Sequence, residues 1–155
     1  MTREVFTPAK SDSAQAGGSV WLLIFAAWLI ALAASLGAIF IGEIMGKTPC
    51  LLCWYQRACM FPLAILLGVA SYYSDGAVWR YALPIAALGG AIAAYHNLLL
   101  AGIIPETIQP CTDTGPSCAS MDLNIVGFIP IPLLSLAAFG FLTMLLILLR
   151  RSAHD

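Results

Sequence analysis

Two cysteines three residues apart begin the most informative segment of the chain. Cys50 and Cys53 follow Pro49, which suits the first position of a helix because its missing N–H would have no partner there. Unpaired amides and the positive dipole end of a helix N-terminus stabilise a thiolate, so we expect Cys50 to lie in the first turn as a reactive thiol. Helical spacing of three and seven residues places Cys53 and Arg57 on the same face as Cys50. The pattern predicts a redox-active pair beside a permanent positive charge.

Three further cysteines are more ambiguous than this pair. Cys59 lies in the same apolar segment, and we expect it to be a small core residue, since free cysteine is among the most buried residue types. Cys111 and Cys118 form a second pair, which with the first could hold zinc or make permanent disulfides. However, six intervening residues exceed the usual zinc-ribbon spacing, and a Cys-x-x-Cys pair at a helix start is typical of redox-active thiols. We therefore predict a redox enzyme without a metal site, and the alternative is a non-enzymatic four-span membrane protein with structural disulfides.

The chain that must position these cysteines is unusually apolar. Of its 155 residues 61% are hydrophobic and 10% charged, with a mean hydropathy of +0.90, whereas soluble domains have roughly 45–50% apolar and about 25% charged residues. A formal net charge of -1 offers no basic field for phosphates, so we expect no nucleic-acid partner. Four apolar segments have about the 20 residues needed to cross a bilayer: 20–41, 50–73, 77–100 and 128–149.

These segments predict an all-α integral membrane protein, an antiparallel bundle of four transmembrane helices over residues 20–149. The connections at 42–49 and 74–76 are short, which favours antiparallel neighbours. Residues 1–19 have few large apolar side chains and are expected to form a disordered cytoplasmic tail, with a second tail at 150–155.

The basic residues predict the orientation of the bundle. Four spans place both termini on one side, and five of the seven basic residues fall there: Arg3, Lys10, Arg80, Arg150 and Arg151. Lys and Arg near helix ends favour the cytoplasmic side, so we expect both termini to be cytoplasmic. Segments 42–49 and 101–127 then face outward. Both cysteine pairs lie on that side, in an oxidising compartment where disulfides persist.

The chain resembles the bacterial disulfide-bond formation protein B family over residues 20–149. Four features carry the resemblance, in the same order along the chain: Cys50-Leu51-Leu52-Cys53-Trp54-Tyr55-Gln56-Arg57, Tyr95-His96, the pair Cys111 and Cys118, and Gly127-Phe128-Ile129-Pro130. Members of this family are quinone-dependent membrane oxidases that regenerate a thioredoxin-fold thiol oxidase. Only six residues separate the cysteines of the second pair, so the chain is similar to the short-loop, BdbC-like members.

The resemblance implies a thiol:quinone oxidoreductase of the bacterial inner (plasma) membrane that reoxidises a DsbA-like partner outside the cytoplasm. It implies that Cys111 takes up the partner as a mixed disulfide and that Cys118 exchanges with Cys50. Cys53 would adjoin a quinone, either ubiquinone or menaquinone, together with Arg57. The charge of Arg57 could stabilise either the Cys53 thiolate or a reduced quinone oxygen. An arginine near a helix end can also serve only as an anchor to lipid headgroups.

The third apolar segment carries one histidine and several small residues. His96 could hydrogen-bond the quinone or relay its protons, or it could be a packing residue, and the sequence favours neither role over the other. Ala86, Gly90 and Ala94 recur every four residues and predict a close approach of another helix.

Overall fold

The computed structural model describes residues 9–46, 48–104, 124–125 and 129–152. Four long helices account for most of this chain: α1 (Ala9–Ile39), α2 (Leu51–Tyr73), α3 (Trp79–Leu100) and α4 (Ile131–Ser152). Three short elements join them: a π-helix, η1 (Phe40–Ile44), a 3-10 turn, η2 (Gly76–Val78), and an antiparallel pair of two-residue strands, β1 (Asn124–Ile125) and β2 (Ile129–Pro130). All four long helices are long and apolar enough to cross a membrane. The predicted all-α, four-span fold class is confirmed.

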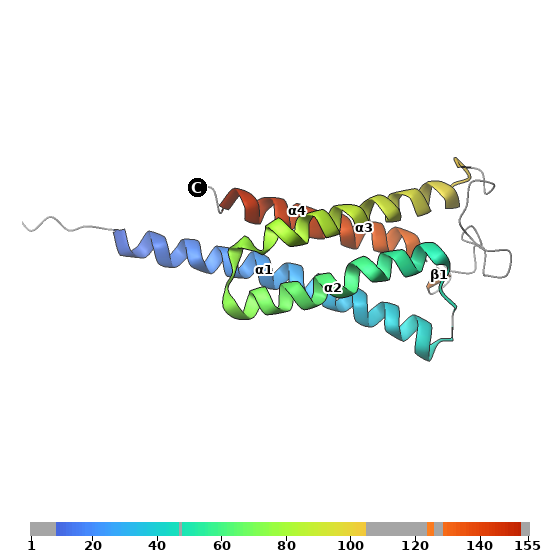
Figure 1. Ribbon diagram of the computed structural model, residues 1–155, viewed down its shortest axis with the longest axis horizontal. Helices are drawn as coiled ribbons and strands as arrows, with labels where there is room; N and C mark the ends of the chain where they lie inside the picture. The colour runs from blue at the N-terminus through green and yellow to red at the C-terminus, as the bar shows by residue number, and fades with distance from the viewer. Residues whose placement is uncertain (1–8, 47, 105–123, 126–128, 153–155) are drawn as a thin grey trace, which may run out of the picture.

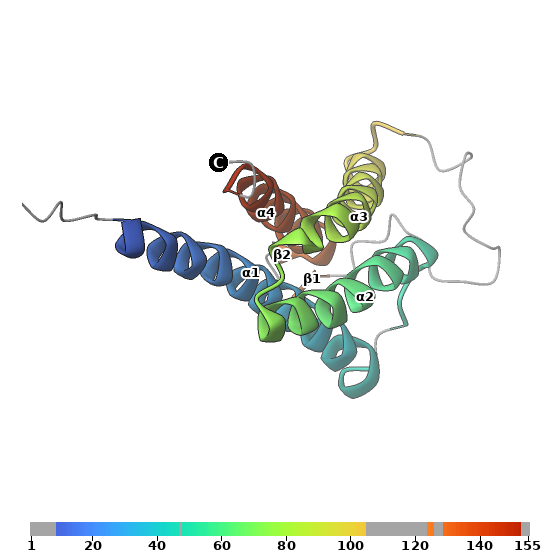
Figure 2. The same ribbon diagram turned by 60° about the vertical axis from the view of Figure 1, so that its left-hand side comes forward.

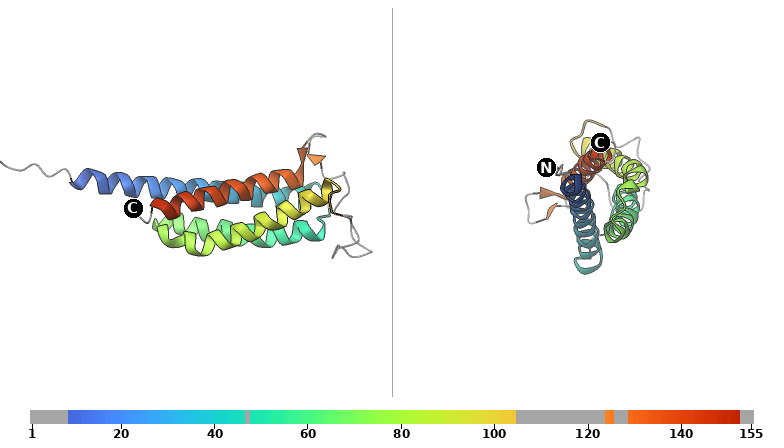
Figure 3. Two further views of the ribbon diagram at one scale, coloured as in Figure 1. Left: turned by 90° about the horizontal axis from the view of Figure 1, so that it is seen from above. Right: turned by 90° about the vertical axis from the view of Figure 1, so that its left-hand side faces the viewer.

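The helices form an antiparallel bundle (Figure 1). Each packs against the next in the sequence, and α4 closes the ring against α1 (Figure 2). The start of α1 and the end of α4 lie at the same end of the bundle, while the connection from α1 to α2 lies at the opposite end (Figure 3). The first and last described residues of the bundle therefore lie on one side, which agrees with the four-span prediction. Which side of the membrane this is stays a prediction.

The first helix is longer than the sequence pattern predicts. It begins at Ala9, so residues 9–19 are helical where we expected part of a disordered tail. Once a span has nucleated a helix, each added residue gains one backbone hydrogen bond, and the Ala, Lys and Gln residues here have favourable helix propensities. The other end also differs, because α4 continues to Ser152 rather than ending at residue 149. Residues 1–8 and 153–155 lie outside the described residues.

The fourth helix starts later than predicted. It begins at Ile131 rather than at residue 128, because β2 occupies Ile129–Pro130 and pairs with β1. Pro132 is then the second helical residue, where the absence of an N–H removes no helical hydrogen bond. Two residues are too few to show an alternating apolar pattern, so these strands could not be predicted from the sequence.

A glycine allows α3 to approach α4 closely. Gly89 is buried, and a Cβ atom built on it would overlap the ring of Phe139, which is 1% exposed. The predicted small-residue stripe is therefore only partly right: Ala86 is buried, but Gly90 and Ala94 are partly exposed. A strict four-residue repeat drifts about 40° around a helix at each step, whereas the observed buried face alternates steps of four and three residues.

Candidate active site

The Cys50 side chain caps the N-terminus of α2. Cys50 has an extended backbone (φ −69°, ψ 168°) and precedes the first helical residue, so it is the N-cap rather than a first-turn residue as predicted. Its carbonyl accepts the first helical bond from the Trp54 amide at 3.1 Å, and its sulfur accepts from the Cys53 amide at 3.4 Å. The sulfur thus occupies the position that a Ser or Asp oxygen has in a common N-cap, facing the unpaired amides of the helix end.

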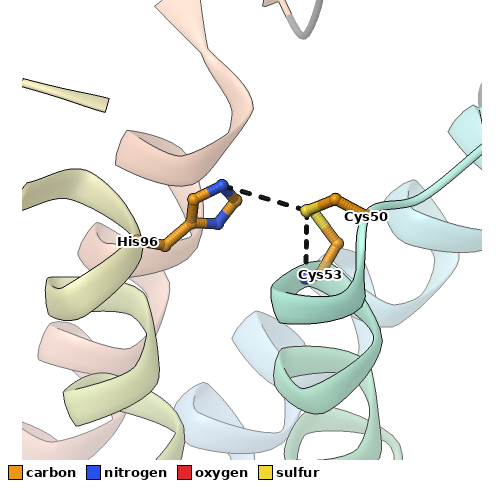
Figure 4. A group of neighbouring side chains, drawn as sticks. All are labelled: Cys50, Cys53 and His96. Atoms are coloured by element: carbon orange, nitrogen blue, oxygen red, sulfur yellow. Dashed lines mark hydrogen bonds between the residues drawn. The ribbon is translucent and has the colours of Figure 1, made fainter. Parts of the chain in front are cut away.

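The two sulfurs and one histidine form a compact group (Figure 4). The Sγ atoms of Cys50 and Cys53 lie 2.9 Å apart, so little movement separates the dithiol from a disulfide, whose bond is about 2.05 Å long. Nε2 of His96 lies 3.9 Å from the Cys50 sulfur. The ring is 0% exposed, which places His96 in the interior beside the cysteines rather than at the membrane surface. The structure therefore brings together three of the predicted site residues.

The surroundings of Cys50 favour its thiolate. A hydrogen bond with the Cys53 thiol, contact with His96 and the Cys53 backbone N–H hold the pKa of Cys50 well below its ordinary value of about 8.5, although burial acts in the opposite direction. Cys50 is also 1% exposed, so the charge is shielded from bulk water. This combination is suited to a thiol that must attack or leave as a thiolate.

Two polar side chains that the sequence analysis did not single out support His96. The Gln56 side-chain nitrogen lies 3.2 Å from Nδ1 of His96, and the Ser135 hydroxyl donates to the Gln56 Oε1 atom at 2.6 Å. Gln56 is buried, at 7% exposure. One signal could have found them: both are polar residues inside apolar spans, and such residues often mark functional positions. That signal alone does not say which residues they contact.

A side-chain amide fixes the end of α3 against α4 nearby. Asn97 donates to the Ala93 carbonyl within α3 and to the Pro132 carbonyl of α4, each at 2.8 Å. Asn97 follows His96 directly, so this contact restrains the segment that carries the histidine.

Arg57 is directed toward a different part of the bundle from the sulfurs. Its Nη2 donates to the Ala38 carbonyl of α1 at 2.7 Å, and its guanidinium lies 5.7 Å from the Trp54 ring centroid. The predicted shared face with Cys50 and Cys53 therefore brings Arg57 near the pair, but its hydrogen bond goes to α1. Among the described residues, no carboxylate forms an ion pair with it.

The segment that follows α1 approaches this guanidinium closely. A Cβ atom at Gly42 would lie 3.1 Å from Nη1 of Arg57, so glycine allows the close approach. Gly42 lies in the π-helix η1, an element that often occurs at functional sites. One turn before Ala38, the buried hydroxyl of Ser35 has no hydrogen-bond partner among the described residues.

These groups fit a small ligand that carries carbonyl or oxyanion oxygens. A guanidinium offers five N–H donors, so Arg57 keeps donors for a ligand after binding Ala38. Trp54 and Tyr55 are 55% and 47% exposed, which gives the adjoining outer surface of α2 a flat aromatic character. A lipid-soluble quinone has this combination of polar oxygens and an apolar ring.

The two cysteines and His96 are also residue types that bind metal ions. The Sγ atoms of Cys50 and Cys53 and a ring nitrogen of His96 lie within 4.8 Å of one another, and no further His, Cys, Asp or Glu among the described residues joins this group. A closed structural zinc site has four protein ligands. We do not assign these residues as metal ligands, and the absence of a metal site stays a prediction.

The chain has three further cysteines. Cys59 is 8% exposed and lies in the main hydrophobic core with Met60 and Leu63, as expected for a packing residue. Cys111 and Cys118 lie outside the described residues, so their pairing and their roles stay predictions.

Comparison with known proteins agrees with this arrangement. The family profile "Disulfide bond formation protein DsbB" matches residues 18–149. A "Probable disulfide formation protein" of Metapseudomonas resinovorans is 53% identical over 137 residues, which cover 88% of this chain and 95% of the relative. "Disulfide bond formation protein C" of Bacillus subtilis is 39% identical over 129 residues, covering 83% and 93%. No solved structure matches the chain significantly.

The family profile covers the four spans together with the Cys-x-x-Cys pair, Arg57 and His96, which the structure gathers at one end of the bundle. The resemblance inferred from the motifs is thereby confirmed: the chain belongs to the DsbB family of disulfide bond formation proteins, which are membrane proteins.

Proposed function

We propose that this protein is a thiol:quinone oxidoreductase that reoxidises a thioredoxin-fold thiol oxidase on the outer side of a bacterial plasma membrane. The observation that carries the proposal is the position of the Cys50–Cys53 pair at the N-terminus of a transmembrane helix, with Arg57 two turns along that helix. A thiol pair in this position lies between the membrane surface, where a partner protein would dock, and the hydrocarbon core, where a lipid-soluble acceptor dissolves.

The first half of the reaction is thiol–disulfide exchange. The partner's dithiol reduces a Cys111–Cys118 disulfide, and the resulting thiols reduce the Cys50–Cys53 disulfide, so that two electrons and two protons move inward at each step. The family resemblance implies that Cys50 is the sulfur that exchanges with the loop pair. The roles of Cys111 and Cys118 follow from the family resemblance.

The second half needs a strong electron acceptor. Thioredoxin-fold oxidases have potentials as high as about −120 mV, well above the glutathione pool, so glutathione could not reoxidise them. A bound quinone, ubiquinone or menaquinone, would supply a two-electron, two-proton acceptor. Arg57 would hold one of its oxygens, Cys53 would adjoin it, and buried His96 would serve as a proton-transfer group near the pair.

Thiol trapping in membranes tests the proposal against a protein that is merely clamped by structural disulfides. Membranes with and without quinone are supplied with a reduced thioredoxin-fold oxidase, and the redox state of each cysteine is read by alkylation and mass spectrometry. We expect Cys50, Cys53, Cys111 and Cys118 to become reduced in the quinone-depleted membranes only. A structural clamp would stay oxidised in both, and that result would refute the enzyme.

Serine variants then establish the order of the relay. Cys111→Ser and Cys118→Ser should block oxidation of the partner yet leave Cys50 and Cys53 able to be reoxidised by quinone. Cys50→Ser or Cys53→Ser should abolish quinone reduction. Cys59→Ala is the matched control, because Cys59 lies in the core and should hardly affect turnover.

A further inference from the structure

A chain of polar contacts links α4 to the sulfur of Cys50. The Ser135 hydroxyl donates to Oε1 of Gln56 at 2.6 Å, and the Gln56 nitrogen lies 3.2 Å from Nδ1 of His96. Nε2 of the same ring lies 3.9 Å from the Cys50 sulfur, toward which Figure 4 shows it directed. Three helices thus contribute to one line of contacts, with Cys50 at its end.

This line of polar contacts lies in the interior of the bundle, where apolar side chains would pack at lower cost. Cys50, Gln56 and His96 are 1%, 7% and 0% exposed, within or at the end of membrane-spanning helices. A buried polar group without a partner is costly, so each of these side chains needs the hydrogen bond of the next. Packing alone does not explain why four polar side chains contact one another in a line here.

We propose that Ser135 and Gln56 are positioning residues that hold Nε2 of His96 toward Cys50, so that the ring exchanges a proton with this sulfur during thiol–disulfide exchange. The proposal rests on the proposed function in one respect, namely that Cys50 is the sulfur that exchanges. The two positioning residues act through His96 and do not themselves touch the sulfur in this structure.

The proposed step moves one proton between Cys50 and His96. When the nucleophile forms, the S–H bond of Cys50 breaks and an N–H bond forms at Nε2 of His96, which leaves a thiolate beside an imidazolium. No electron moves in this step. When Cys50 becomes a thiol again, the same proton returns to its sulfur.

An amide and a hydroxyl are suited to support this cycle. For Nε2 to accept the proton, the neutral ring carries its own proton on Nδ1, which donates to Oε1 of Gln56, while the Gln56 amide donates to Ser135. In the observed arrangement the amide is turned by 180°, so its nitrogen faces Nδ1 and Ser135 donates to Oε1. Because both side chains offer a donor and an acceptor, the pair satisfies either tautomer of His96.

Other ionisable groups near Cys50 and His96 must be considered in any pH measurement. Among the described residues, α2 contributes Cys53 and the charge of Arg57. From α3, Tyr95 packs against the buried cluster that contains Cys50. From α4 the contact is the uncharged hydroxyl of Ser135. The substitutions below leave Cys53, Arg57 and Tyr95 unaltered and change only the uncharged polar groups of Ser135 and Gln56.

The test is the pH dependence of Cys50 alkylation in the reduced full-length protein. Iodoacetamide reacts with the thiolate, and mass spectrometry of the Cys50 peptide gives its rate separately from the other cysteines. Ser135→Ala should move the Cys50 pKa upward and lower the alkylation rate about threefold to tenfold on the acid side of that pKa, the equivalent of one hydrogen bond of roughly 0.7–1.4 kcal/mol. Ser135→Thr, which keeps a hydroxyl, should restore the wild-type profile.

A matched control is available on the same helix. Thr143 donates to the Phe139 carbonyl within α4, so Thr143→Val removes a hydroxyl of similar burial that does not reach the site. It should leave the Cys50 profile unchanged. Gln56→Met, of similar volume but without hydrogen-bonding groups, should shift the profile in the same direction as Ser135→Ala and at least as far, and it carries the test if Ser135→Ala does not fold.

The measurement needs neither quinone nor partner, so it separates this proposal from the proposed function. An unchanged Cys50 profile in folded Ser135→Ala or Gln56→Met would overturn the positioning role, even if quinone-dependent turnover were intact. Equal shifts in Thr143→Val and Ser135→Ala would also overturn it, because they would indicate a general effect of perturbing α4.

Discussion

Arg57 combines a permanent charge with a position inside a transmembrane helix. Its guanidinium is bound to the Ala38 carbonyl and lies against Trp54, with no ion pair to any described residue. An ionisable group within a span is costly and usually faces the protein interior or a functional path. A backbone carbonyl satisfies one of five donors, so anchoring to α1 alone does not account for the choice of arginine over lysine.

The first prediction concerns this side chain. Arg57→Met should raise the quinone KM about tenfold to hundredfold, because a charge-assisted hydrogen bond is worth roughly 1.5–3 kcal/mol. Arg57→Lys should fall between wild type and Met, since it keeps the charge but loses the planar donors. Steady-state kinetics with varied quinone measures this, and single-turnover exchange with the partner should be nearly unchanged. An unaltered quinone KM would leave Arg57 as an anchor to α1.

Gly42 offers a way to disturb Arg57 without replacing it. A Cβ atom would lie 3.1 Å and 3.2 Å from the two terminal nitrogens of Arg57, so Gly42→Ala should displace the guanidinium by a few tenths of an ångström and raise the quinone KM in the same direction as Arg57→Lys. Gly37→Ala is the control, because nothing lies within 4 Å of its added Cβ. Equal effects of the two variants would point to helix propensity rather than to Arg57.

At the scale of the helices, the sequence was sufficient for some features and not for others. Span length and hydropathy depend only on local composition, so the four helices were predictable, and Cys50 to Arg57 lie within one stretch of chain. The link from Ser135 to Gln56 joins residues 79 positions apart, and that from Gln56 to His96 joins residues 40 apart. Such contacts depend on how three helices rotate against one another, which no single span specifies.

The face that α3 turns toward α4 can be tested at its buried glycine. Gly89→Ala should destabilise the bundle by about 1–3 kcal/mol, because the added methyl would overlap the buried Phe139 ring, whose neighbours leave it little freedom. Gly90→Ala is the matched neighbour: its Cβ would lie at an ordinary 3.6 Å from Phe139, and alanine favours the helix by about 1 kcal/mol. Thermal unfolding in detergent should rank Gly89→Ala lowest, and a reversed ranking would contradict the observed helix face.

At the scale of the whole molecule, charged and aromatic side chains gather at the end that carries the termini. The guanidinium groups of Arg80 and Arg150 lie 5.7 Å and 5.2 Å from the Trp79 ring centroid, which joins the start of α3 to the end of α4. The Trp21 indole donates to the Ser71 carbonyl at 3.1 Å and joins α1 to α2 at the same end. Tryptophan and arginine at one end are typical of a membrane interface, and the arginines favour the cytoplasmic one.

This distribution predicts that the Cys50 end of the bundle faces outward, and labelling of introduced cysteines tests it. In intact cells, a membrane-impermeant maleimide should modify Ile103→Cys, which follows α3 at the Cys50 end and is 68% exposed. It should modify Ser74→Cys, in the exposed turn between α2 and η2, only after the membrane is opened. Mass spectrometry locates each label and separates it from the native cysteines. The reverse pattern would place Cys50 and Cys53 in the reducing cytosol, where disulfides are rare, and would contradict both the orientation and the proposed partner.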